Sequence, residues 1–82
     1  MPSILQINGW RFFFYANENN EPPHIHVCRG DSDCKFWLYA KKFDIGEAYS
    51  YNCSLSEKRQ IRKIIFEHFD YLILEYNKFH KK

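Results

Sequence analysis

The sequence predicts an α+β fold: a mainly antiparallel sheet of four to five strands, with one long C-terminal helix packed on one face. Three observations support this. Asn8-Gly9 and the segment 30–33 are turn sequences between runs rich in aromatic and β-branched residues. After Ser54, apolar residues recur at helical spacing. With 82 residues, the chain suits one domain, 1–82.

The first predicted hairpin turns at Asn8-Gly9, because both central residues of a two-residue type I′ turn need φ > 0. The turn fixes the pairing of the two strands. One side of the ribbon carries Ile7 with Trp10, Leu5 with Phe12 and Ser3 with Phe14, and the other carries Gln6 with Arg11 and Ile4 with Phe13.

The second predicted hairpin joins residues 24–29 to residues 34–39. It begins after Pro22-Pro23, because proline has no N–H to donate to a strand ladder. We place its turn between Asp31 and Ser32. This register pairs Val27 with Phe36, Ile25 with Leu38, Cys28 with Lys35, His26 with Trp37, and His24 with Tyr39.

The segment 40–53 allows either a further short strand near residues 48–51 or an irregular crossing. Ser54 and Glu57 then match a capping box, with Ser56 as an alternative cap. The apolar stripe of the predicted helix consists of Ile61, Ile64, Ile65, Phe69, Leu72, Ile73 and Tyr76, with His68 beside them.

The helix stripe must pack on one face of the sheet. Because strand side chains alternate, we expect that face to carry Leu5, Phe12, Phe14, Ile25, Val27, Phe36 and Leu38. The other face then combines cations, aromatics, a thiol and two histidines. We expect the chain itself or a second copy to cover it. Its members are Gln6, Arg11, Phe13, Tyr15, His24, His26, Cys28, Lys35, Trp37 and Tyr39.

Composition narrows the functional classes. Charged residues make up 27% of the chain and hydrophobic residues 45%, which is typical of a globular domain. The formal net charge of +2 is smaller than that of a domain with an obvious nucleic-acid footprint. No apolar run reaches the ~20 residues of a membrane span, and no signal peptide is evident, so we expect a cytoplasmic protein. The three cysteines match neither a disulfide framework nor a zinc ribbon, and we expect reduced thiols and no cofactor.

The chain resembles a family of small bacterial proteins known as domain of unknown function 4160. The resemblance rests on Gly9-x-Arg11-Phe12-x-Phe14-Tyr15, on Glu18 before Pro22-Pro23-His24-Ile25-His26-Val27, on Lys35-Phe36-Trp37-Leu38, and on the terminal helix. It implies a small cognate protein, encoded nearby, as partner, and a role in a toxin–antitoxin-type pair. Cys28 and Cys34 depart from the pattern that the family leads us to expect.

A catalytic role for the histidines is one hypothesis. A neutral His24 or His26 would accept the 2′-hydroxyl proton of RNA, and the other, protonated, would donate to the leaving oxygen. Arg11 or Lys35 would stabilise the pentavalent phosphate, with Tyr15 alongside. The alternative is an ordinary polar sheet face in a dimer interface.

Two binding hypotheses use the same face. Phe13, Tyr15, Trp37 and Tyr39 can stack bases of single-stranded RNA, with Glu18 of the preceding loop in the same binding surface. His24, His26 and Cys28 can ligate a transition metal. Same-face residues of a strand stand nearly 7 Å apart, however, so we prefer histidines that hydrogen-bond to loop carbonyls or Tyr39.

The leading functional prediction is a partner-binding module of a toxin–antitoxin-type pair, in one version an RNA-directed toxin. The alternatives are a metal-independent ribonuclease-like enzyme that uses His24, His26, Arg11 and Lys35, and a metal-binding protein. A homodimer is compatible with each of them.

Overall fold

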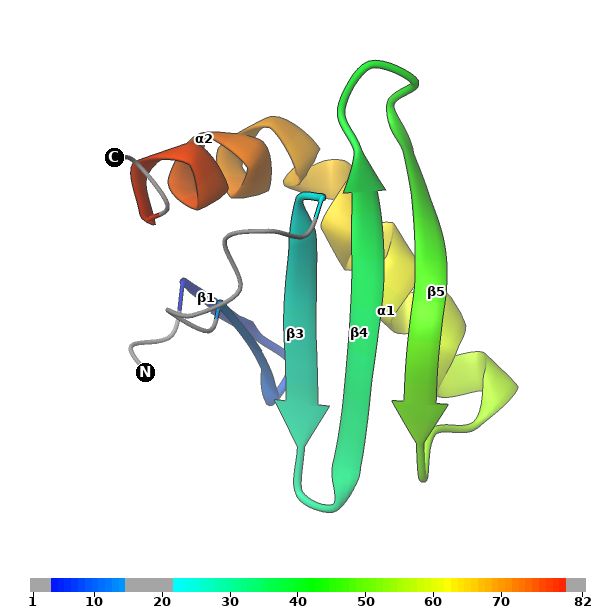
Figure 1. Cartoon of the computed structure of the whole chain (residues 1–82). Coiled ribbons are helices and arrows are strands. Elements are labelled where there is room, and N and C mark those ends of the chain that lie inside the picture. Colours follow the sequence, from blue (N-terminus) through cyan, green and yellow to red (C-terminus); the bar gives the residue numbers. More distant parts are fainter. Residues whose placement is uncertain (1–3, 15–21, 80–82) are drawn as a thin grey trace.

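Five antiparallel strands form one sheet, and two helices cover one of its faces (Figure 1). The structure is a computed structural model that describes residues 4–14 and 22–79. The strands follow one another across the sheet in chain order, β1-β2-β3-β4-β5. The elements are β1 (Leu5–Ile7), β2 (Trp10–Phe13), β3 (His24–Arg29), β4 (Ser32–Tyr39), β5 (Asp44–Tyr51), α1 (Leu55–Glu67) and α2 (Phe69–Phe79). Within the described ranges, neither helix has the length and apolar character needed to cross a membrane.

The first hairpin has the predicted register. Asn8 and Gly9 both have positive φ, 55° and 84°, as a type I′ turn requires. Leu5 opposes Phe12, and Gln6 opposes Arg11. The predicted pair of Ser3 with Phe14 lies outside the described residues, because Ser3 is not among them.

The predicted register of the second hairpin is wrong by two residues. The turn consists of Gly30 and Asp31, so Arg29 opposes Ser32 and His24 opposes Trp37. Gly30 has a φ of 57°, the conformation that the first central residue of a type II′ turn needs. A two-residue loop keeps more of both strands paired than a four-residue loop would. The prediction of which side chains share a face of the sheet is still correct, because a shift by two residues leaves every side chain on its own side.

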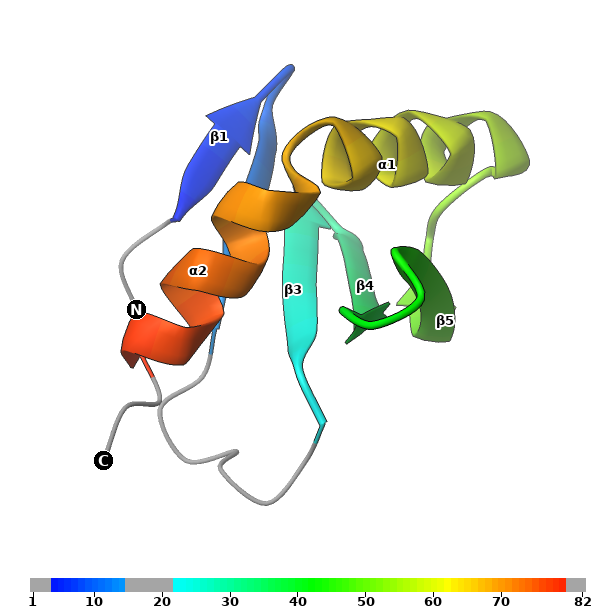
Figure 2. The same ribbon diagram turned by 90° about the horizontal axis from the view of Figure 1, so that it is seen from above.

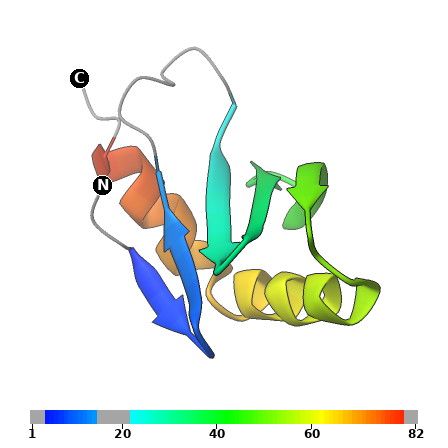
Figure 3. The ribbon, with the colours of Figure 1, turned by 90° about the horizontal axis from the view of Figure 1, so that it is seen from below.

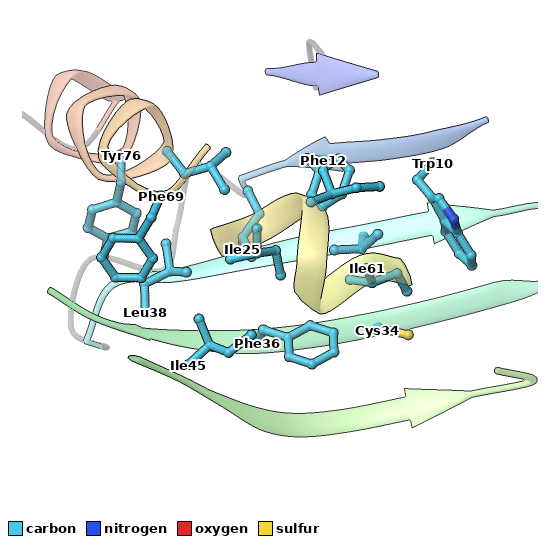
Figure 4. Close-up of a cluster of buried hydrophobic side chains, with 14 of the residues drawn as sticks. Trp10, Phe12, Ile25, Cys34, Phe36, Leu38, Ile45, Ile61, Phe69 and Tyr76 are labelled. Carbon is cyan, nitrogen blue, oxygen red and sulfur yellow. The ribbon is translucent and has the colours of Figure 1, made fainter. Parts of the chain in front are cut away.

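The core lies between the sheet and the helices (Figure 4). Six of the seven residues predicted for this face are buried, and Leu5 packs against the cluster while partly exposed. The helices contribute most of the predicted stripe, although Ile73 is only half-buried. The fully buried members include Trp10, Phe12, Ile25, Val27, Cys34, Phe36, Ile61, Ile65 and Leu72.

The single long helix that we predicted is two helices, which break at His68. His68 has a φ of −119° and a ψ of 23°, outside the helical region. One straight helix over residues 55–79 would be about 37 Å long, whereas five strands span only about 19 Å across a sheet. The break keeps the apolar stripe on the twisted sheet: α1 lies near β4 and β5, and α2 lies near β1 to β3 (Figures 2 and 3).

Phe43 packs over the break from the turn between β4 and β5. Its ring centroid lies 4.8 Å from that of Phe69 and 5.7 Å from that of Phe66. Phe43 has a φ of 51°, which costs a bulky side chain about 1–2 kcal/mol. The contacts with the two helical rings offset this strain.

Arg29 joins the first hairpin to the start of α1. Its guanidinium carbon lies 3.9 Å from the centroid of the Trp10 ring, and one of its nitrogens donates to the Asn8 carbonyl. Its other terminal nitrogen donates to Glu57 Oε2 at 2.8 Å. The predicted capping box is present, because Glu57 Oε1 accepts the Ser54 N–H and Ser54 Oγ accepts the Glu57 N–H.

We expect this carboxylate to make stability depend on pH. The pKa of Glu57 lies below its ordinary value of 4.5, first because of the Ser54 N–H and then because of Arg29. Its stabilising contribution is therefore complete above pH 4.5 and is lost as the pH falls through the lowered pKa. Glu57→Gln keeps an acceptor but not the charge. The thermal midpoint of wild type should exceed that of Glu57→Gln at neutral pH and converge with it in acid. A difference that does not change with pH would contradict the assignment.

Candidate functional site

The predicted site residues of β2, β3 and β4 gather on the helix-free face of the sheet, the face opposite α1 and α2 (Figure 1). His26 lies between Phe13 of β2 and Lys35 of β4. His24, two residues earlier, opposes Trp37. The strand register thus brings two aromatic rings and two imidazoles into adjacent positions.

Four rings, Phe13, His24, His26 and Trp37, form a ring cluster on this face. The Phe13 and His26 rings stack at a centroid distance of 5.6 Å. His24 contacts His26 edge-on at 5.2 Å and Trp37 edge-on at 5.6 Å. At the start of β3 its ring also reaches Tyr76 of α2, at 6.0 Å. These separations are typical of attractive aromatic contacts, so the cluster is a packed unit.

The ring cluster belongs to the interior of the single chain. His24 is fully buried and His26 is 2% exposed, while Phe13 is 8% exposed and Trp37 is half-buried. The His24 Nδ1 atom lies 2.9 Å from the Pro22 carbonyl oxygen. A carbonyl only accepts, so this contact assigns the proton of neutral His24 to Nδ1. His24 therefore anchors the double-proline segment at the start of β3.

Both predicted cations contact rings of the cluster. Lys35 Nζ lies 4.6 Å from the Trp37 ring centroid, and the Arg11 guanidinium carbon lies 5.7 Å from that of Phe13. Lys35 is 8% exposed, whereas Arg11 is exposed to solvent. Both cations thus lie within cation–π distance of a ring of the cluster.

The remaining predicted residues lie elsewhere. Tyr39 is exposed at the end of β4, and Cys28 is half-buried one row from His26. Tyr15 and Glu18 lie outside the described residues. Among residues 4–14 and 22–79, no three His, Cys, Asp or Glu side chains are grouped closely enough to hold a metal ion. His24, His26 and Cys28 therefore do not form a ligand set in this part of the chain.

A second surface lies along β5, where the sequence allowed either a short strand near residues 48–51 or an irregular crossing. This strand is eight residues long and pairs only with β4 among the described strands. The other edge strand of the sheet, β1, has only three residues. The edge of β5 is therefore the longer backbone edge in the described structure.

A β-bulge decides which side chains β5 presents. Lys35 opposes Tyr49 and Phe36 opposes Glu47, so Ala48 is the additional residue. Glu47 consequently faces the helices, where Lys58 binds it at 3.4 Å. Tyr49 then lies on the helix-free face with its neighbour Tyr51, at a ring distance of 5.6 Å. Gly46 and the Tyr49-Ser50-Tyr51 alternation are the sequence signals that could have identified this strand.

Tyr39 connects the edge to a hollow of about 360 Å³ at the end of β4. A Cβ atom placed on Gly46 would lie 2.8 Å from the Tyr39 hydroxyl, so the absence of a side chain at Gly46 lets the phenol cross onto β5. The hollow is lined by Pro22, Pro23 and residues 38–42. The edge of β5, the rings of Tyr39, Tyr49 and Tyr51, and this hollow therefore form one continuous surface, which we call the β5 surface.

Because His24 and His26 are buried, we expect their substitution to destabilise the fold. His24→Ala and His26→Ala each remove a ring from a packed cluster, and we expect each to lower the free energy of unfolding by about 2–3 kcal/mol. Arg11→Ala, on the exposed rim, should change it by less than about 1 kcal/mol, because an exposed cation–π contact contributes no more than that. Urea unfolding of the three variants measures this. Histidine variants as stable as Arg11→Ala would show that the cluster contributes no packing energy.

Comparison with known proteins places the chain in a family. No curated protein and no solved structure matches it. The model of the family described as domain of unknown function DUF4160 matches residues 9–77, which include β2 to β5, α1 and most of α2. The match confirms the resemblance carried by the PPHIHV and KFWL segments. The chain belongs to the DUF4160 family.

Proposed function

We propose that this protein is a partner-binding module of a toxin–antitoxin-type pair, and that its cognate protein docks on the β5 surface. The observation that carries the proposal is the eight-residue edge strand with exposed aromatic side chains beside it. An extended segment that pairs with such an edge gains main-chain hydrogen bonds along its length. The side chains near the edge then supply the specificity.

The side chains of the β5 surface fit a polypeptide partner. Tyr51 is 63% exposed and Tyr39 is 40% exposed, and tyrosine is enriched at the centres of protein interfaces. The charged residues of β5 itself are acidic, Asp44 and Glu47. Glu47 is paired with Lys58 on the helix side, so the exposed aromatic rings, and not the charges of β5, favour a polypeptide partner.

The edge of β5 lacks two of the residue types that protect sheet edges, although its β-bulge is itself a feature that discourages pairing. Natural edge strands often carry lysine or proline, which discourage pairing with another chain. β5 contains neither, and the two lysines nearest its start, Lys41 and Lys42, lie in the preceding turn. Its bulge leaves the small Ala48 exposed at the middle of the strand.

The ribonuclease version of the proposal uses His24 and His26. It requires the ring cluster to open, because both imidazoles are buried and His24 contacts the Pro22 carbonyl. Partner binding needs no such rearrangement. If the protein arrests growth on expression, relief by both His24→Ala and His26→Ala, with the variants still folded, would favour the enzyme.

Substitutions on β5 test the docking surface. Tyr51→Ala and Ala48→Lys should each weaken binding to the neighbouring gene product at least tenfold, since one removes an aromatic anchor and the other places a cation on the edge. Leu74→Ala is the matched control, because Leu74 is 54% exposed on α2. Isothermal titration calorimetry measures the affinities, and thermal unfolding verifies that the variants fold.

Three outcomes would contradict the proposal. The first is equal affinity for wild type and both β5 variants. The second is a loss of binding in Leu74→Ala as large as that in Tyr51→Ala. The third is β5-dependent self-association without any binding of the neighbouring gene product, which would assign the edge to a homodimer.

A further inference from the structure

Two of the three cysteines lie in direct contact although their positions in the sequence are far apart. Cys34 is fully buried on the core face of β4, near the start of the strand, and its sulfur is visible toward one end of the core cluster (Figure 4). Cys53 is half-buried in the connection between β5 and α1. The two Sγ atoms are 3.4 Å apart. Cys28 lies on the opposite side of the sheet, in the row of Arg11 and Asp33.

Hydrogen bonds on both sides of Cys53 hold it against Cys34. The preceding residue, Asn52, has a φ of 54° and donates from its amide to the Asp31 carbonyl. The Asn52 carbonyl accepts the Ser32 hydroxyl at 2.6 Å. The following residue, Ser54, is the N-cap of α1. The contact between the two sulfurs is therefore built into the fold, because the turn between β3 and β4 and the start of α1 both position it.

We propose that Cys34 and Cys53 form a peroxide-responsive dithiol site, which closes reversibly into an intramolecular disulfide. A disulfide needs its sulfurs ~2.0 Å apart, so the two Sγ atoms must approach each other from their present 3.4 Å. The bond would tie β4 to the start of α1 and enclose residues 35–52, which include all of β5.

The different environments of the two thiols assign their roles. Cys53 is the half-buried residue of the pair and Cys34 the fully buried one, so Cys53 meets the oxidant first. Burial, followed by the interaction with Cys53, raises the pKa of Cys34 to about 12, so Cys34 remains a thiol at neutral pH. Its S–H donates to the Cys53 sulfur. Cys34 is thus the resolving group, protected from direct oxidation by the core.

The chemistry balances with one hydroperoxide molecule. The Cys53 sulfur attacks one oxygen of hydrogen peroxide and the O–O bond breaks, which gives Cys53 sulfenic acid and one water. The Cys34 sulfur then attacks the Cys53 sulfur, the S–O bond breaks, and the hydroxide leaves with the Cys34 proton as a second water. Two thiols lose two electrons, and the peroxide gains them. A dithiol reductant reverses the reaction.

Mass spectrometry of the folded full-length protein tests the proposal. Treatment with stoichiometric hydrogen peroxide should remove two hydrogen atoms from the intact mass of the monomer, and peptide mapping should locate the bond between Cys34 and Cys53. The oxidised protein should unfold at a temperature higher by on the order of 10 °C, and dithiothreitol should reverse the shift. Cys28→Ser is the matched control and should behave as wild type. Cys53→Ser, which leaves the buried Cys34 intact, should show neither the bond nor the shift.

Several results would overturn the proposal. One is a disulfide that includes Cys28, whether within one chain or between two chains. Another is oxidation of Cys53 to sulfinic acid with Cys34 still reduced. A third is an identical thermal shift in wild type and Cys53→Ser, since that shift would come from a different modification.

Discussion

The burial of β3 on both faces is the constraint on which the rest of this structure depends. Ile25 and Val27 face the helices and His26 faces the other way, while the ring of His24 also reaches Tyr76 of α2 at 6.0 Å. All four of these β3 residues are buried. A strand buried on both sides normally carries apolar residues on both. Here one side consists of imidazoles, and burying a polar group is costly unless it has a suitable contact. The Pro22 carbonyl provides such a contact for His24, and the rings of Phe13 and Trp37 pack against the two imidazoles.

Local signals in the sequence were sufficient for the elements and their faces. Each of these signals lies within a few residues, and the structure contains all of them: the Asn8-Gly9 turn, the Ser54 capping box, the alternation of apolar residues in the strands and their helical spacing after Ser54. The register of the second hairpin was wrong because segment 30–33 offers two turns that keep the same faces. The break at His68 was not predictable from periodicity, since the stripe continues across it without glycine or proline.

The candidate site was only partly predictable, for a different reason. Strand alternation correctly brought His24, His26, Lys35 and Trp37 onto one face. Their burial depends on how the whole chain packs around that face, and no short sequence pattern records this. The bulge at Ala48 hides the alternation of β5, so the sequence allowed only a short strand near residues 48–51, or an irregular crossing, where the structure has a strand from Asp44 to Tyr51. The contact between Cys34 and Cys53 depends on a connection whose course only the folded chain defines.

The two helices contact different parts of the sheet. Side chains of α1 bind the end of β3 and the middle of β5. The contacts of α2 lie instead with the N-terminal residues of the sheet: the Tyr71 hydroxyl donates to the Ile4 carbonyl, and the Tyr76 ring packs against Phe14. Cooperative opening of a protein follows such groupings of contacts. Amide hydrogens of α2 and β1 would therefore exchange with solvent as one unit and those of α1 and β5 as another, with His68 as the boundary between them.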